Sequence, residues 1–199
     1  MLRKRSPSPM RGSTAAESLA TAGDRVGIWQ KNCPEFVPAL FGILMAGGVV
    51  VPINTFLKPS EVAFILQDAG VEVLIAEPSH ADAIQAIDGL REGRPPLKVL
   101  MADPFGAAPA KSGDGLRGLP GQARSEWDLA LIIYTSGTTG HPKGAMLSHG
   151  NLLANVESCR QVLQAVDLDR FVILLPMFHS FMLCVGVLLP LLVGCSMVV

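Results

Sequence analysis

The chain has 199 residues, of which 49% are hydrophobic and 17% are charged. This balance excludes an intrinsically disordered chain, and the length suffices for one domain with a buried core or for part of a larger one. The formal net charge is −1 and no basic stripe with interleaved aromatic residues is present, which argues against a nucleic-acid partner.

The first residues, 1–22, are polar and basic and carry no acidic side chain before Glu17. They contain no apolar core, so they are not a secretory signal. We expect a disordered leader or a truncated start, although the same composition also fits an organellar transit peptide. The expected location is cytoplasmic, with organellar import left open.

Residues 23–102 alternate between short apolar runs and segments with helical spacing. Strands are predicted over residues 24–29, 49–53, 71–76 and 97–101. Helices are predicted to start within Asn32-Cys33-Pro34-Glu35, with Pro34 as the first helical residue, at Pro59 and at Ser79. The first is apolar nearly all round, as expected for a helix sandwiched inside a protein. Successive β-α units are typical of a parallel sheet. We therefore predict a first α/β subdomain with a parallel or mixed sheet and helices on its faces.

Residues 103–126 are rich in glycine, proline and alanine and show no hydrophobic period. This composition predicts a flexible linker. Beyond it, residues 127–199 are predicted to form a second α/β subdomain that is incomplete at its C-terminus. Its expected elements are a strand over 129–133, a helix capped by Ser148, a strand over 171–175, a helix over 180–193 broken near Pro190, and a strand from Ser196. Because the sequence ends inside that strand, an uncovered sheet edge and helix should make the isolated chain poorly soluble.

The stretch 171–199 carries no charged side chain and is long enough to cross a membrane. Pro176, His179 and Pro190 interrupt it, and it divides naturally into a strand, a loop, a helix and a strand. We therefore predict a buried β-α-β segment, while peripheral membrane contact stays open.

The cysteines are scattered through apolar patterns without a Cys-x-x-Cys pair, at Cys33, Cys159, Cys184 and Cys195. Cysteines in this setting are predicted to be buried free thiols in a reducing compartment. No metal site is predicted from them.

A glycine-rich loop joins the strand over 129–133 to the helix at Ser148, and its sequence is Tyr134-Thr135-Ser136-Gly137-Thr138-Thr139-Gly140-His141-Pro142-Lys143-Gly144. The glycines allow a tight turn with backbone N–H groups close to a ligand, while the hydroxyls and Lys143 add donors and a cation. This combination suits a polyphosphate cradle. The Walker spacing is absent, which argues against a P-loop NTPase, whereas composition alone would also fit an ordinary surface loop.

The order of residues from Tyr134 to Gly144 resembles the signature loop of the adenylate-forming enzymes, which include acyl-CoA synthetases, luciferases and nonribosomal-peptide adenylation domains. In that family the loop holds the β and γ phosphates of ATP while a carboxylate attacks the α phosphorus. The resemblance implies a catalytic role for Lys143 in countering the charge that develops. It implies nucleotide binding by Thr135, Ser136, Gly137, Thr138, Thr139, Gly140 and Lys143.

A second motif, from Pro176 to Phe181, follows a predicted strand at its carboxyl end, where open α/β sheets bind ligands. It resembles the family's Pro-x-Phe-His motif, whose histidine lies beside the acyl group and the adenylate. The resemblance assigns His179 to the catalytic site and Phe178 to the neighbouring wall. The family usually has glycine where this chain has Met182, which leaves the size of the acyl pocket open.

Taken together, the resemblance implies part of the large N-terminal domain of an adenylate-forming enzyme, most like the fatty-acyl ligases. The expected reaction is ATP-dependent activation of a carboxylate to acyl-AMP, with a fatty acid as the expected substrate and its chain length left open. Mg²⁺ is expected to be held by a ligand outside these residues. Transfer to coenzyme A or to the phosphopantetheine of a carrier protein would follow. The alternative is a non-catalytic truncated remnant that at most binds nucleotide phosphates. The oligomeric state stays open.

Overall fold

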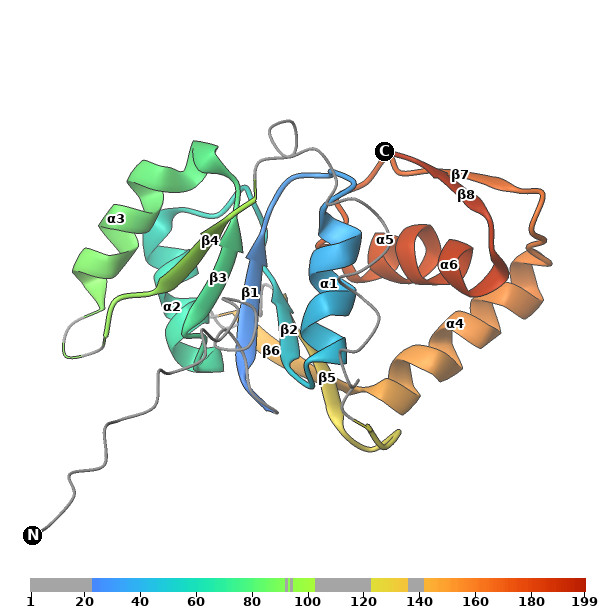
Figure 1. Cartoon of the computed structure of the whole chain (residues 1–199), viewed down its shortest axis with the longest axis horizontal. Coiled ribbons are helices and arrows are strands. Elements are labelled where there is room, and N and C mark those ends of the chain that lie inside the picture. The colour runs from blue at the N-terminus through green and yellow to red at the C-terminus, as the bar shows by residue number, and fades with distance from the viewer. Residues whose placement is uncertain (1–22, 92, 94, 103–122, 136–141) are drawn as a thin grey trace, which may run out of the picture.

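A computed structural model describes residues 23–91, 93, 95–102, 123–135 and 142–199 of the chain. Its main sheet has six strands in the order β4-β3-β1-β2-β5-β6 (Figure 1). The strands are β1 (Arg25–Trp29), β2 (Val49–Pro52), β3 (Val73–Ala76), β4 (Lys98–Met101), β5 (Leu129–Thr135) and β6 (Lys143–Ser148). The first five strands run parallel, whereas β6 is antiparallel to β5, so the predicted α/β fold with a parallel or mixed sheet is confirmed.

Helices cover both faces of this sheet because its central strands are apolar on both sides. Along β2, Val50 belongs to the core on the face of α1 (Phe36–Met45), while Val49 and Val51 belong to the core on the face of α2 (Pro59–Ala69) and α3 (Ala81–Leu90). This alternation is the two-residue period of a strand. A strand buried on both faces reads in the sequence as an unbroken hydrophobic run.

The first helix, α1, packs one stripe of side chains between the main sheet and the later segment 173–187. Pro38, Gly42 and Met45 are exposed, so the burial on all sides that its apolar character predicts is not observed. Phe36, Leu40 and Ile43 are buried, and they share a core with Ile173 and Leu183 from that later segment. The helix begins at Phe36, two residues beyond the predicted first position at Pro34, which leaves a loop after the end of β1.

The boundaries of the next two helices follow local signals. Lys58 donates its backbone N–H to the Glu61 carboxylate at the start of α2, and Gly70 ends that helix with φ of +68°. Ser79 was expected to start the third helix, but it lies within a 3₁₀ turn, η1 (Pro78–His80), that precedes α3. Leu90, which the helical spacing assigns to the inner face of α3, is exposed.

The C-terminal elements form a smaller layer beside α1 (Figure 1). They comprise α4 (His149–Leu163), β7 (Arg170–Val172), α5 (Ser180–Met182), the π-helical η2 (Leu183–Leu188), α6 (Leu189–Val193) and β8 (Ser196–Val198). Strands β7 and β8 pair in parallel as a second sheet. The helix predicted over 180–193 is present, and it does not break near Pro190 as expected. It instead widens into a π-helical turn just before Pro190, which has no backbone N–H to donate.

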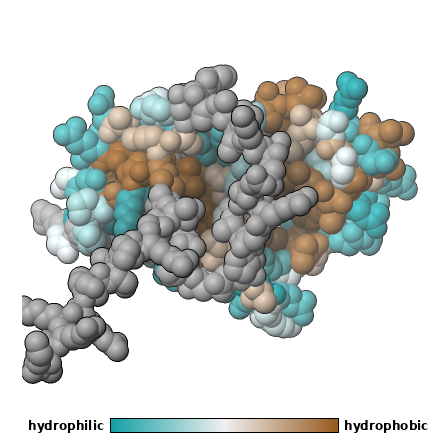
Figure 2. Space-filling model, viewed as in Figure 1, coloured by the Kyte–Doolittle hydropathy of each residue, from teal (hydrophilic) through white to brown (hydrophobic). Residues whose placement is uncertain are grey.

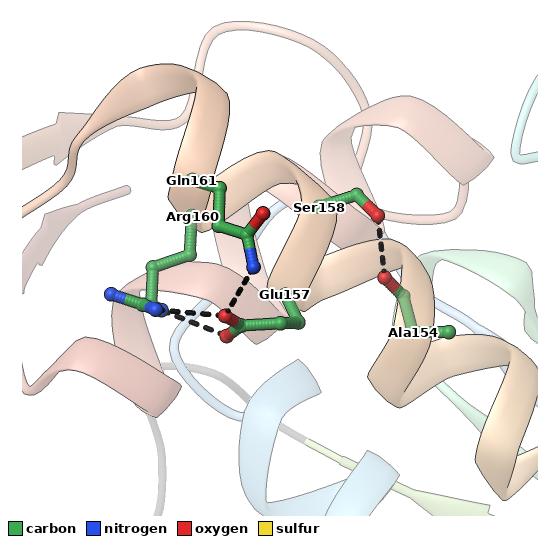
Figure 3. Close-up of polar contacts among 5 residues, drawn as sticks. All are labelled: Ala154, Glu157, Ser158, Arg160 and Gln161. Carbon is green, nitrogen blue, oxygen red and sulfur yellow. Dashed lines mark hydrogen bonds and ion pairs between the residues drawn. The ribbon is translucent and has the colours of Figure 1, made fainter.

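The helix α4 starts where the sequence predicts, with Ser148 as its cap. The Ser148 hydroxyl accepts a hydrogen bond from the Asn151 N–H, and the Asn151 side chain accepts one from the Ser148 N–H. Its apolar side chains recur at helical spacing, but among the described residues Val156 is the one that is buried. Leu152 and Cys159 are half-buried, and Leu153, Val162 and Leu163 are exposed. The outer side carries a polar network in which Glu157 accepts hydrogen bonds from Arg160 and Gln161 (Figure 3).

The prediction that a loop runs directly into the helix at Ser148 is wrong for residues 143–148, because these residues form strand β6. Lys143 and Gly144 therefore lie in a strand. The segment has few residues with high strand propensity, so pairing with the free edge of β5 decides its conformation. Strands β5 and β6 belong to the same sheet as β1 to β4, so one sheet contains strands from both sides of the expected linker 103–126. The expected leader 1–22 and residues 103–122 of that linker lie outside the described residues.

Within the described residues, no helix is long and apolar enough to cross a membrane. The apolar helical segment from 180 to 193 instead contributes Met182, Leu183 and Val187 to the core beside α1.

Candidate functional site

The carboxyl ends of three neighbouring parallel strands meet at one edge of the main sheet. β1, β2 and β5 are adjacent, and they end at Trp29, Pro52 and Thr135. Ligands of open α/β sheets bind at this edge because the loops that leave the strands there can converge. Both sequence motifs are connected to it.

The first motif begins at the mouth of the β5–β6 hairpin. Thr135, the last residue of β5, pairs in register with Lys143, the first residue of β6, and both residues are exposed. A hydroxyl and an ammonium group therefore flank the two ends of the glycine-rich loop, a donor set that suits phosphate oxygens. The predicted contacts Ser136, Gly137, Thr138, Thr139 and Gly140 lie outside the described residues.

A hydrogen bond fixes the base of this hairpin to α2. The Tyr134 hydroxyl donates to Asp68 Oδ2 at 2.6 Å. Burial, and then the neighbouring Asp68 carboxylate, raise the pKa of Tyr134, so its hydroxyl stays protonated and able to donate. Tyr134 thereby holds the strand position next to Thr135.

Gly144 leaves room for the side chains of Tyr134 and Ile132 on the neighbouring strand. It pairs with Tyr134 across the two strands. A Cβ atom at this position would lie 2.9 Å from Ile132 Cγ2 and 3.0 Å from Tyr134 Cζ, closer than ordinary van der Waals contact. The glycine that the signature predicts at 144 is therefore required here for close packing of strand neighbours.

The second motif is tied to the same sheet edge by Asn32, which lies just beyond the end of β1. Asn32 Nδ2 donates to the Leu175 carbonyl at 2.9 Å and to the Ile173 carbonyl at 3.4 Å. Asn32 Oδ1 accepts from the Met177 N–H at 2.8 Å. One amide side chain thus satisfies three backbone groups of the segment that leads to His179.

An aromatic contact connects the motif to the end of β2. The rings of Phe56 and Phe178 meet edge to face, with centroids 6.3 Å apart and planes inclined by 75°. Phe56 follows the carboxyl end of β2 and is highly exposed. Asn32 and Phe56 together place the turn before His179 over the ends of β1 and β2, next to the end of β5.

The exposed side chain of His179 caps the short helix α5. His179 Nδ1 accepts a hydrogen bond from the Phe181 N–H at 3.3 Å. A neutral ring that accepts at Nδ1 carries its proton on Nε2, which makes Nε2 a donor. Among the described residues, no hydrogen bond joins His179 to Thr135 or Lys143, so the common sheet edge is what relates these three predicted residues.

Asn32 and Phe56 were not predicted as site residues. The sequence does carry a signal for both, because each follows a predicted strand by a few residues at its carboxyl end. Their contacts to residues 173–178 depend on how the C-terminal layer packs, which no local pattern specifies.

Met182 is buried in the core beside α1. Its side chain packs against Gly186 and shares that core with Ile173. A Cβ atom at Gly186 would overlap Met182 Sδ. The bulky thioether that replaces the usual glycine of the motif is therefore accommodated by a glycine four residues later.

An apolar groove of about 310 Å³ lies elsewhere, between α1, α4 and α6. Phe41 and Leu44 line it from the later part of α1, and His149 and Leu152 line it from the start of α4. Ser148, just before α4, pairs with the first residue of β5. The groove is thus near the amino ends of the strands and away from the candidate site.

The described part of the chain holds no group of three or more His, Cys, Asp or Glu side chains that could bind a metal ion.

Comparison with known proteins gives a family match over most of the chain. The family model described as "AMP-binding enzyme" matches residues 16–199. One curated relative is a feruloyl-CoA synthase from Amycolatopsis sp, which is 39% identical over 84% of this chain and 32% of the relative. Another is the long-chain-fatty-acid–CoA ligase FadD13 from Mycobacterium tuberculosis, which is 37% identical over 79% of this chain and 31% of the relative. The chain therefore spans about a third of the length of these relatives.

A solved structure agrees with the fold. ATP-bound MatB from Rhodopseudomonas palustris superposes with a TM-score of 0.77 at 29% identity, covering 92% of this chain and 37% of MatB. The fold of this chain, a mixed sheet with helices on its faces, is thus similar to the matching part of MatB.

Proposed function

Since the chain belongs to the family of AMP-binding enzymes, we propose that it takes part in the ATP-dependent activation of a carboxylate to acyl-AMP, followed by transfer of the acyl group to a thiol. The observation that carries this proposal is the meeting of two motifs at one sheet edge. Thr135 and Lys143 stand at the mouth of the β5–β6 hairpin, and Asn32 holds the segment of His179 beside it.

Lys143 and Thr135 are the described residues that we assign to the phosphates of ATP. The Lys143 ammonium group would counter negative charge, and the Thr135 hydroxyl would donate a hydrogen bond. We assign Ser136, Gly137, Thr138, Thr139 and Gly140 to the same phosphates on the strength of the signature sequence. ATP with Mg²⁺ supplies the activated phosphorus and a pyrophosphate leaving group.

His179 is assigned to the carboxylate side of the site. With Nδ1 engaged by the Phe181 N–H, the ring can donate from Nε2 to an oxygen of the substrate. The Asn32 hydrogen bonds fix the backbone leading to the ring, so the donor is positioned before the substrate arrives.

An apolar acyl group is the substrate class that the surroundings favour. Phe56, Leu174 and Phe181 are exposed around the turn that carries Phe178 and His179. Exposed apolar side chains grouped beside polar ones are typical of a binding surface for an amphipathic ligand. We propose a fatty acid, with an aromatic acid such as the one named for the feruloyl-CoA relative as the competing substrate, and coenzyme A or carrier-protein phosphopantetheine as the acceptor.

The proposal is tested by trapping acyl adenylate with hydroxylamine, with long-chain fatty acids and aromatic acids compared as substrates. Lys143→Ala should lower the rate of hydroxamate formation by about 10²-fold or more, since it removes one charge-stabilising group. The matched control is Lys98→Ala, which removes an exposed lysine from β4 and should leave the rate unchanged. Equal rates for Lys143→Ala and the unaltered protein would contradict the assignment, and the absence of hydroxamate with every acid would favour the non-catalytic alternative.

A further inference from the structure

Two cysteines from separate elements face each other in the C-terminal layer. Cys159 Sγ, on α4, and Cys184 Sγ, on η2, are 3.9 Å apart. Both cysteines are free thiols, and Cys184 is buried while Cys159 is half-buried. Cys159 is therefore the more accessible residue of the pair.

The other two thiols are isolated from this pair. Cys33 lies in the core beside α1, whereas Cys184 belongs to a separate apolar cluster with Val156 and Leu189. Cys195 donates its thiol to the Val166 carbonyl at 2.9 Å. Among the described residues there is thus one close cysteine pair, and the other two cysteines serve as comparison thiols in an oxidation experiment.

The separation of the sulfur atoms is short enough for a bond to form with side-chain rotation. A disulfide needs sulfur atoms about 2.0 Å apart and Cβ atoms about 4 Å apart. The elements α4 and η2 pack directly against each other through the cluster of Val156, Cys184 and Leu189. A change of χ1 moves a sulfur atom far enough to cover the remaining gap of roughly 2 Å.

We propose that Cys159 and Cys184 form an oxidation site that closes into an intramolecular disulfide when the protein meets a peroxide. The inference stands apart from the proposed function, because it rests on the two thiols alone.

The reaction would start at Cys159, the more accessible thiol. Its thiolate attacks one peroxide oxygen and becomes a sulfenic acid, while the O–O bond breaks and hydroxide leaves. Cys184 Sγ then attacks Cys159 Sγ, the S–O bond breaks, and the released hydroxyl takes up the Cys184 proton as water. Two thiols lose two electrons and one peroxide is reduced to two waters.

The order of the two steps has a structural basis. Burial, together with the neighbouring Cys159 thiol, raises the pKa of Cys184 to about 12, so Cys184 keeps its proton at neutral pH. A protonated, buried thiol is a poor first target for an oxidant. It can still act as the second partner because the sulfur of Cys159 is already next to it.

The bond would join two segments that lead from the candidate site. α4 follows β6, which begins at Lys143, and η2 follows α5, which His179 caps. A covalent link between α4 and η2 would limit how far these two segments can move apart.

Peptide mapping tests the proposal directly. The purified chain is treated with hydrogen peroxide, remaining thiols are alkylated, and tryptic peptides are compared with and without reductant. Cleavage after Arg160 and Arg170 separates Cys159 from Cys184, so the expected product is a reducible cross-linked peptide containing both. Because Cys184 and Cys195 share a peptide, Cys195→Ser serves as the matched control and should retain the cross-link.

Cys159→Ser and Cys184→Ser should each lose the cross-linked peptide completely. The proposal would be overturned by a cross-link to Cys33 or Cys195, by intermolecular dimers alone, or by oxidation of Cys159 that stops at the sulfinic acid in the otherwise unaltered chain. The unaltered chain decides the question even if a serine variant does not fold, since its linked peptide identifies both partners.

Discussion

At the residue scale, Asn32 is the side chain that most directly joins the two parts of the molecule. Replacing it with alanine would leave the Ile173 and Leu175 carbonyls and the Met177 N–H without their side-chain partner. We expect Asn32→Ala to lower the free energy of unfolding by about 1–3 kcal/mol, because partly buried backbone groups lose hydrogen bonds. Urea unfolding followed by circular dichroism measures this difference.

Asn155→Ala is the matched control for that change. Asn155 is exposed on α4, and its side chain contacts the Cys159 thiol only at 3.9 Å. Its replacement should change stability by less than about 0.5 kcal/mol. Equal losses for the two variants would mean that Asn32 contributes no more than an ordinary surface amide.

His179 combines a structural and a proposed chemical role, and two substitutions separate them. Asparagine can replace the Nδ1 acceptor at the helix cap but supplies no group equivalent to Nε2, whereas alanine supplies neither. His179→Asn should therefore keep the melting temperature while lowering the rate of hydroxamate formation by about 10-fold or more. His179→Ala should lower both quantities. An asparagine variant with full activity would exclude donation from Nε2.

His80 gives the chain a dependence of stability on pH. Its ring stacks on Trp29 with centroids 4.0 Å apart, and burial lowers the pKa of His80 although Glu77 opposes this shift. Below the ordinary pKa of 6.5, the unfolded chain binds a proton that the folded chain resists, so stability falls as pH decreases from that value. Thermal melts between pH 7.5 and 5 should show a steeper loss for the unaltered chain than for His80→Gln. Parallel curves for the two proteins would show that another group titrates.

At the scale of elements, the β5–β6 hairpin depends on a glycine facing a tyrosine. Gly144→Ala would bring a Cβ atom into the space of Ile132 and Tyr134, and the tyrosine would have to move from Asp68. We expect a loss of about 1–3 kcal/mol in the free energy of unfolding, as for other overpacked sites. Chemical denaturation measures it, and the Tyr134 absorbance reports the change in its hydrogen bond.

Gly89→Ala provides the control, because a Cβ atom there meets nothing within 4 Å in helix α3. This variant should be stabilised by up to about 1 kcal/mol through helix propensity. If Gly144→Ala is equally tolerated, the tyrosine does not fix the hairpin.

The elements also differ in how far the sequence could predict them. Strands such as β2 and β3 were predictable because valine, isoleucine and leucine runs mark strands that are buried on both faces. β6 was missed since its residues are mostly exposed and its conformation depends on the edge of β5. For the candidate site, the two sequence motifs predict Lys143 and His179, and their roles stay predictions. Asn32 acquires its place only through contacts with residues 173–177, which no local pattern specifies.

At the scale of the whole molecule, apolar side chains gather over the part of the surface formed by α4, α6 and β7 (Figure 2). Leu153 and Leu192 line the apolar groove there and are 61% and 50% exposed. We expect the isolated chain to bind an apolar fluorescent dye and to self-associate. The double substitution Leu153→Glu and Leu192→Glu should reduce both dye fluorescence and the apparent mass in sedimentation.

Leu168→Glu is the comparison, since Leu168 is 87% exposed but does not line the groove. It should leave the dye signal close to that of the unaltered chain. A chain that is monomeric and binds no dye before substitution would contradict the expectation.

The strand order of the main sheet also has a consequence for synthesis on the ribosome. β1 lies between β2 and β3, and β4 joins β3, so these four strands can pair soon after they emerge. The other edge of β2 must wait until β5 has been translated, because β5 is its partner there. During that interval the nascent chain exposes a row of unpaired backbone groups on an apolar strand, a feature that chaperones recognise and that slows folding.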